Sequence, residues 1–132
     1  MNFEKISVFS KYLFFLCLVL ILVFSALPGV SVESYEVADG FSFRLDYLLH
    51  FLAYSALTGF FLLWKKDNRV ISILMGLIIG VLVAFMTEFQ QQFIPGRTFN
   101  PVDAYFNVSG SFVGIVVMDF FRQKIIFNEH DS

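Results

Sequence analysis

The sequence has little charge and almost no cysteine. Asp, Glu, Lys and Arg together make up 15% of the 132 residues, below the share of about 25% that is usual for a soluble domain. Cys17 is the single cysteine, so an intrachain disulfide is excluded and the cysteine content does not indicate a redox compartment. The formal net charge of -2 carries little information as a sum, because a bilayer sorts charges by side.

Apolar residues, by contrast, make up 58% of the chain, and 19 residues are Phe. A helix needs about 20 apolar residues to cross a hydrocarbon core of about 30 Å. Four segments, each bounded by turn or charged residues, meet this length: roughly 12–27, 47–64, 70–87 and 104–121. We expect the third to continue as a helix toward Ile94. The sequence therefore predicts an all-α membrane protein, a four-transmembrane-helix bundle that forms a single domain over residues 1–132 without a soluble catalytic domain.

Basic residues gather on one side of the predicted spans. Seven of the nine Lys and Arg residues lie in the two terminal tails and the second loop, which leaves Arg44 and Arg97 for the other side. By the positive-inside rule both termini are cytoplasmic, and residues 31–45 and 94–102 face outward. A cleaved signal peptide over residues 1–26 is the competing interpretation, and it would leave the other three spans with the same orientation.

Polar residues mark the predicted outer ends of three spans. One pair spaced four apart opens the second span, a pair with the same spacing opens the fourth, and a third pair closes the third span, followed by an arginine. A central Asp or Arg costs roughly 2.5 to 3.5 kcal/mol in a bilayer, so this convergence at one depth indicates a site. We call these seven residues the polar layer: Asp46, His50, Glu88, Gln91, Arg97, Asp103 and Asn107.

Structural interpretations compete with a functional one for each of these residues. Asp103 follows an Asn-Pro pair typical of a helix start, so it is explained equally by complementing the helix dipole, and Asp46 by capping the second helix. Glu88 and Arg97 are placed for a structural ion pair at the headgroup level. His50 taken alone is typical of a packed, hydrogen-bonded histidine. The coincidence of all of them at one depth favours function.

Small residues in the last two spans have a packing interpretation. Glycines spaced four apart over 76–80 and 110–114 permit close approach between membrane helices. If these two faces meet, the third and fourth helices pack as a tight pair and hold Glu88 close to the start of the fourth. Asp119 and Arg122 are spaced for a local ion pair, and we assign them no function.

Two blocks of the sequence carry most of the polar layer. Residues 46–54 read Asp-x-x-x-His-Phe-x-x-Tyr, and residues 88–97 read Glu-x-x-Gln-x-x-x-Pro-x-Arg, followed over 103–114 by Asp-x-x-x-Asn-x-x-Gly-x-x-x-Gly. These blocks resemble the VanZ-like family of bacterial membrane proteins, named for a protein linked to low-level teicoplanin resistance. Tyr47 stands where that family usually carries Lys, and Arg44 is a candidate substitute. The resemblance implies a role in the bacterial envelope and, through it, in glycopeptide resistance.

Three functions fit these observations. In the first, a non-enzymatic protein binds the headgroup of a lipid or lipid-linked envelope precursor, with Arg97 on a phosphate or carboxylate. In the second, an intramembrane enzyme uses His50 or Glu88 as general base and Arg97 to stabilise an anion. In the third, the bundle is a scaffold without a site.

We favour the first function, with no identified catalytic residue. A lone histidine among scattered carboxylates is a poor zinc signature, so we expect no metal and no cofactor. The expected location is the bacterial cytoplasmic membrane, crossed several times. The expected partners are membrane lipids or a lipid-linked precursor and no nucleic acid, and a homodimer is compatible with the lipid-exposed surface of so small a bundle.

Overall fold

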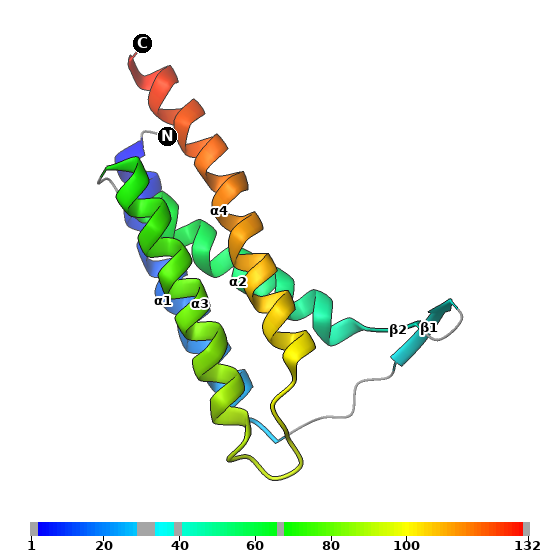
Figure 1. The fold of residues 1–132 in the computed structure, drawn as a ribbon. Helices are drawn as coiled ribbons and strands as arrows, with labels where there is room; N and C mark the ends of the chain where they lie inside the picture. The colour runs from blue at the N-terminus through cyan, green and yellow to red at the C-terminus, as the bar shows by residue number, and fades with distance from the viewer. Residues whose placement is uncertain (1–2, 29–33, 39–40, 66–67, 131–132) are drawn as a thin grey trace.

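Four long helices dominate the structure (Figure 1). It is a computed structural model that describes residues 3–28, 34–38, 41–65 and 68–130. Between the first two helices the chain forms a two-stranded hairpin. The elements in chain order are α1 (Phe3–Ser25), β1 (Ser34–Ala38), β2 (Phe41–Arg44), α2 (Leu45–Trp64), α3 (Arg69–Gln91) and α4 (Pro101–His130).

All four helices are long and apolar enough to cross a membrane, which confirms the predicted fold class. Large apolar side chains such as Phe24, Leu49 and Phe85 leave more than half of their surface exposed. Continuous apolar surface of this kind is rare on soluble monomers and is the normal surface of a protein in lipid. The protein is therefore a multi-pass membrane protein.

The helices are longer than the predicted spans. α1 begins at Phe3 and not near residue 12, and α4 continues past residue 121 to His130, because turns of helix project beyond the apolar run at each end. α3 ends at Gln91, close to the expected end. The predicted spans therefore correspond to the apolar cores of these helices.

The hairpin was not predicted, since the segment 31–45 was expected to be only a loop. β1 and β2 pair antiparallel, with Ser34 opposite Arg44 and Tyr35 opposite Phe43. The alternation of polar and apolar residues in 41–44 is the period of a strand and was the available signal. Residues 31–33 and 39–40 of the expected loop lie outside the described residues, as does the side chain of Arg44.

α4 packs most closely against α2, and it also packs against α3, the pairing that the glycine spacing suggested. A Cβ atom placed on Gly110 would collide with the backbone carbonyl of Phe51, and one on Gly114 with that of Ser55. The α4 glycines therefore let two backbones touch, and Ser55 Oγ donates a hydrogen bond to the Gly110 carbonyl across this contact at 2.8 Å. In α3, Gly80 faces Thr58 of α2 and Ser111 of α4.

The start of α1, the end of α2, the start of α3 and the end of α4 lie at one end of the bundle, which we call the terminal end (Figure 1). The segment 92–100 between α3 and α4 lies at the opposite end, which we call the loop end. This arrangement agrees with the predicted grouping of the tails and the second loop on one side. Both polar pairs that open α2 and α4 therefore belong toward the loop end.

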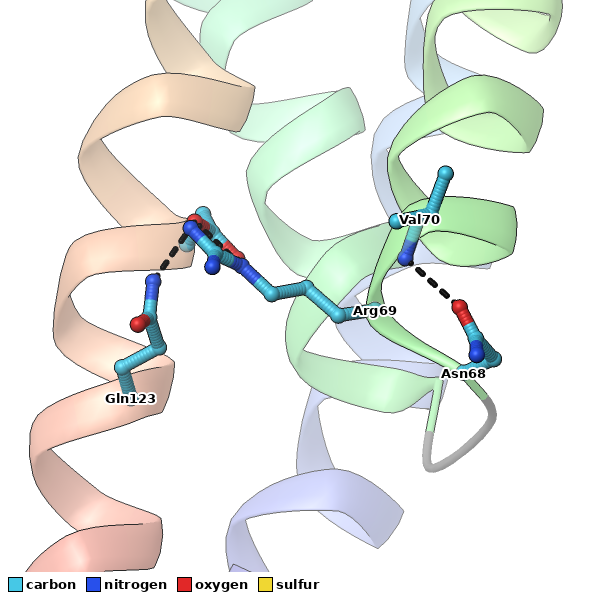
Figure 2. Close-up of polar contacts among 5 residues, drawn as sticks. Asn68, Arg69, Val70 and Gln123 are labelled. Atoms are coloured by element: carbon cyan, nitrogen blue, oxygen red, sulfur yellow. Dashed lines mark hydrogen bonds and ion pairs between the residues drawn. The ribbon is translucent and has the colours of Figure 1, made fainter.

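The terminal end is closed by an ion pair between α3 and α4 (Figure 2). Arg69 Nη2 lies 2.6 Å from Asp119 Oδ2, and Arg69 Nε donates to both carboxylate oxygens at 3.1 Å. Gln123 Nε2 donates to the same Oδ2 at 2.8 Å, while the Asn68 side chain caps α3 by accepting from Val70 N. Asp119 is therefore paired between helices and is not limited to the local pair with Arg122 that its spacing suggested.

α1 contacts α2 through an aromatic cluster near the terminal end. The rings of Phe14, Phe61 and Trp64 lie with their centroids 5.5 to 5.9 Å apart. Ser7 Oγ donates to the Trp64 carbonyl at 2.7 Å. α2 crosses the bundle obliquely, so that its first residues lie well away from the end of α1 (Figure 1). α1 and α2 are therefore in contact near the terminal end and separate toward the loop end.

Candidate binding site at the loop end

Three residues of the polar layer form a buried chain of hydrogen bonds across three helices. His50 Nδ1 of α2 lies 2.9 Å from Asn107 Oδ1 of α4. Asn107 Nδ2 in turn donates to Glu88 Oε1 of α3 at 3.4 Å. Asn107 and Glu88 are both fully buried. The structure therefore brings the polar ends of α2, α3 and α4 together, as their common depth predicted.

The chemistry of the three side chains determines which of their atoms donate and which accept these hydrogen bonds. The Asn107 amide nitrogen donates to Glu88 Oε1, so the amide group lies with its nitrogen toward α3. The Asn107 oxygen then faces His50, and a carbonyl oxygen also only accepts. His50 must therefore carry its proton on Nδ1, which leaves Nε2 as an acceptor when the ring is neutral. Glu88 thereby sets the tautomer of an imidazole on another helix.

Glu88 has partners, but the contacts are long. Its second oxygen accepts from the backbone N–H of Asn100 at 3.4 Å, which equals the length of the bond from Asn107. Both distances exceed the usual 2.7 to 3.2 Å of a protein N–H···O bond, so the carboxylate is only weakly satisfied. Asp103 and Arg97 act on it as nearby charges of opposite sign. The site thus holds a buried acceptor whose own contacts leave capacity for a ligand donor.

Arg97 is held by a turn and reaches α1. Ile94-Pro95-Gly96-Arg97 closes with a hydrogen bond of 3.0 Å from Arg97 N to the Ile94 carbonyl, and Gly96 has a φ of 80°. Pro followed by Gly with a positive φ is typical of a type II turn. Arg97 Nη1 donates to the Ser25 carbonyl at 3.3 Å. The guanidinium is therefore bound to the end of α1, and the structural ion pair with Glu88 is not what fixes it.

The remaining members of the polar layer lie around this chain. Asp103 is buried in the first turn of α4, and the Asn100 side chain caps that helix by accepting from Val102 N at 3.0 Å, as the Asn-Pro pair predicted. Asp46 lies in the first turn of α2, where its Oδ1 accepts from the next backbone N–H at 3.0 Å. Gln91 is buried at the end of α3. Asp46 therefore has a local structural contact as well as a place in the layer, and the cap of α4 is made by Asn100 and not by Asp103.

A second set of polar contacts lies one turn deeper, and sequence reasoning missed it. Tyr54 Oη and Thr87 Oγ1 are 2.7 Å apart between α2 and α3. Thr58 Oγ1 donates to the Ser111 carbonyl of α4 at 2.9 Å. The signal was available in α2, where Asp46, His50 and Tyr54 recur every four residues on one face.

A pocket of about 560 Å³ opens beside the polar layer, between α1 and the first half of α2. Its wall is almost entirely apolar, and Thr87 of α3 contributes to it. Two members of the polar layer, Asp46 and His50, belong to the wall, as do Tyr54 and Ser25. The buried hydrogen-bonded chain therefore meets an apolar cavity at His50.

The donor set gives no sign of a metal centre, since the described residues contain no cluster of three or more His, Cys, Asp or Glu side chains able to hold an ion. Comparison with protein-family models, with curated proteins and with solved structures finds no match for this chain. The case for a function therefore rests on the geometry of the polar layer.

Proposed function

We propose that this protein binds the headgroup of a membrane lipid, or of a lipid-linked envelope precursor, in its polar layer. The observation that carries the proposal is the buried chain from His50 through Asn107 to Glu88. Burying the Glu88 carboxylate and the Asn107 amide in a membrane protein is costly, and both lie with the half-buried His50 imidazole at the junction of three helices. A scaffold needs none of them.

The chemistry of the layer favours a headgroup with mixed character. Arg97 is the cation of the layer and suits a phosphate or carboxylate. Glu88 and Asp103 accept hydrogen bonds and suit hydroxyl, amide or ammonium donors, while His50 offers an acceptor at Nε2. A purely anionic ligand would meet repulsion from the carboxylates. A sugar, a peptide or a zwitterionic headgroup satisfies both sets of groups.

The resemblance to the VanZ-like family supports a place for this function in the bacterial cytoplasmic membrane. With both termini in the cytoplasm, the loop end and its polar layer lie in the outer leaflet, where lipid-linked wall precursors present their headgroups. Binding there would change the access of a glycopeptide such as teicoplanin to the precursor. Glycopeptide resistance is accordingly part of this proposal.

The test is to identify the lipids that copurify with the protein by native mass spectrometry. Glu88→Gln keeps the shape of the side chain and Arg97→Gln removes the guanidinium group, and we expect each to lower the amount of bound lipid about tenfold, the ratio that corresponds to about 1.4 kcal/mol. Asp119→Asn removes a carboxylate from the terminal end and serves as the matched control. Equal lipid content in all four proteins would refute headgroup binding.

A resistance assay separates the binding protein from the scaffold. His50→Ala, Glu88→Gln and Arg97→Lys should each abolish a resistance phenotype while membrane expression stays normal. If all three variants keep the phenotype, the polar layer has no role in it and the scaffold function is favoured.

One observation favours an enzyme as the second candidate. A histidine whose Nδ1 proton is held by a fixed acceptor, and whose Nε2 is left to accept a proton, has the orientation expected of a general base. His50 meets both conditions through Asn107. Single-turnover incubation with lipid-linked substrates decides between the two: a product that disappears in His50→Ala would establish catalysis, and bound but unchanged substrate would establish the binding protein.

A further inference from the structure

The pocket beside the polar layer results from the way α1 and α2 diverge. The aromatic cluster of Phe14, Phe61 and Trp64 holds the two helices together near the terminal end. Toward the loop end they separate (Figure 1), and the pocket of about 560 Å³ occupies the space between them. This volume lies within the range of about 300 to 1,000 Å³ that is usual for ligand sites.

The depth of the pocket matches one leaflet of a bilayer. Its wall on α1 extends from Ser25 to Cys17, which is about 12 Å at 1.5 Å per residue. Half of a hydrocarbon core of about 30 Å is about 15 Å. On α2 the wall runs from Asp46 to Tyr54. The pocket therefore runs from the polar layer toward the middle of the membrane.

Hydrocarbon is the occupant that suits this wall. An apolar cavity does not hold water, which needs two to four polar partners, and an empty cavity forfeits packing energy. The wall residues Leu20, Phe24 and Leu49 leave 43%, 62% and 59% of their surface exposed, so the pocket opens sideways to the lipid. A chain can thus enter from the membrane without crossing the polar layer.

The mouth of the pocket is chemically continuous with the proposed headgroup site. Ser25 forms part of the wall, and its carbonyl accepts the hydrogen bond from Arg97. Asp46 and His50 stand on the α2 wall. A molecule with a hydrocarbon chain in the pocket thus meets a guanidinium from the α1 side and a carboxylate and an imidazole from the α2 side. Charge complementarity selects an anionic group near Arg97.

We infer that the pocket between α1 and α2 binds one hydrocarbon chain of a lipid whose headgroup places its phosphate on Arg97 and its hydroxyl or amine donors on the carboxylates of the layer. The inference rests on the proposed function and adds where the hydrocarbon chain goes and which group of the headgroup meets Arg97. Each buried methylene adds about 0.8 kcal/mol to binding, so chain length contributes to affinity as well as headgroup identity.

The test uses phosphatidylglycerol with a photoreactive diazirine near the end of one acyl chain, in vesicles of phosphatidylglycerol and phosphatidylethanolamine that contain the full-length protein. After irradiation, mass spectrometry of peptides maps the labelled residues. We expect labelling to concentrate on Cys17, Ile21 and Tyr54, about tenfold above that of Phe85. Phe85 of α3 is the matched control, because it is exposed to lipid and does not belong to the pocket. Uniform labelling of the exposed apolar residues would overturn the inference.

Filling the pocket gives a second measurement. Ala53→Trp places a large side chain on the pocket wall and should lower the labelling of Cys17 about tenfold. Leu52→Trp changes the preceding residue, which does not line the pocket, and should leave the labelling unchanged. Equal labelling in the two variants would contradict the inference.

A competition in the unmodified protein keeps the inference testable if Ala53→Trp does not fold. Excess unlabelled phosphatidylglycerol should displace the probe, and diacylglycerol, with the same chains and no anion, should displace it at least tenfold less well. Equal competition would refute the contact with Arg97.

These results separate the two proposals. If labelling is uniform while copurified lipid still depends on Glu88 and Arg97, the headgroup site stands and the pocket inference fails. If labelling is uniform and copurification is also unaffected by those substitutions, both fail.

Discussion

Each end of the bundle holds a buried carboxylate, and the two carboxylates are satisfied in different ways. At the terminal end, Asp119 accepts from Arg69 and Gln123 at 2.6 to 3.1 Å. At the loop end, Glu88 accepts from Asn107 and a backbone N–H at 3.4 Å. Glu88 is also fully buried, whereas the Arg69 side chain is 58% exposed.

This difference separates a structural ion pair from a candidate binding group. Asp119 has a charged, bidentate partner that compensates it within the protein. Glu88 has only neutral donors at the limit of hydrogen-bond length, although its desolvation is more complete. A ligand donor would therefore improve the surroundings of Glu88 and would add little to those of Asp119.

Asn107→Leu should have the largest effect. It removes the bridge at the loop end and leaves the buried Glu88 without that donor, at a cost of about 1 to 3 kcal/mol, to which the half-buried His50 adds less. Unfolding in detergent or bicelles, followed by circular dichroism, measures it. A decrease of less than about 1 kcal/mol in the free energy of unfolding would mean that the hydrogen bonds of Asn107 contribute little to stability. The loop end and the terminal end would then differ less than we infer.

Gly110→Ala comes next. Its methyl group would collide with the Phe51 carbonyl, so α2 and α4 must separate, at about 1 to 3 kcal/mol for such overpacking. The separation should also lengthen the contact between His50 and Asn107 and lower lipid binding. Gly96→Ala has no atom to collide with but requires a positive φ, and so it tests whether the turn alone positions Arg97. Wild-type lipid content in Gly110→Ala would show that the helix contact does not set the site.

Glu88→Gln and Asp119→Asn compare the two ends directly. Glu88→Gln removes a weakly compensated buried charge, so the protein should be as stable as the wild type or more stable while it loses lipid. Asp119→Asn removes the partner of Arg69, so it should be slightly less stable and keep its lipid. If instead Glu88→Gln lowers the melting temperature and keeps its lipid while Asp119→Asn loses lipid, then Glu88 is the structural group and Asp119 the binding group.

The smallest expected effect is that of salt concentration on the stability of the wild type and of Asp119→Asn. The pair of Arg69 and Asp119 is partly exposed and is screened by added ions, while the buried chain at the loop end is not. Raising the salt concentration should slightly lower the stability of the wild type and leave that of Asp119→Asn almost unchanged. An equal response in both proteins would show that the exposed pair makes no measurable contribution.

The sequence was sufficient for the four helices and for the depth of the polar layer. Both follow from the thickness of the bilayer and the rise of a helix, which a residue count can supply. The pairing of individual groups was not predictable, because it depends on the rotation of each helix about its axis. That rotation is set by the contact of Gly110 and Gly114 with the backbone of α2. The spacing of the glycines does not indicate which helix they contact.

Contacts between distant segments were also beyond sequence reasoning. Arg97 lies near the Glu88 carboxylate, as expected, but its hydrogen bond to the carbonyl of Ser25, 72 positions earlier in the chain, was not predictable. The three-residue spacing of Asp119 and Arg122 suggested a local ion pair, whereas Arg69 reaches Asp119 from α3. The oblique orientation of α2, which creates the pocket, could not be predicted from the apolar segments of the sequence.

The first helix has a consequence for how this protein is processed. α1 contributes one wall of the cavity and the carbonyl that anchors the guanidinium of Arg97. A signal peptidase that cut after residue 26 would remove both and bare the hydroxyl groups of Tyr54 and Thr87 to the membrane. The proposed lipid binding therefore requires that α1 stays in the mature polypeptide, and intact-mass measurement of the natively expressed protein would test this.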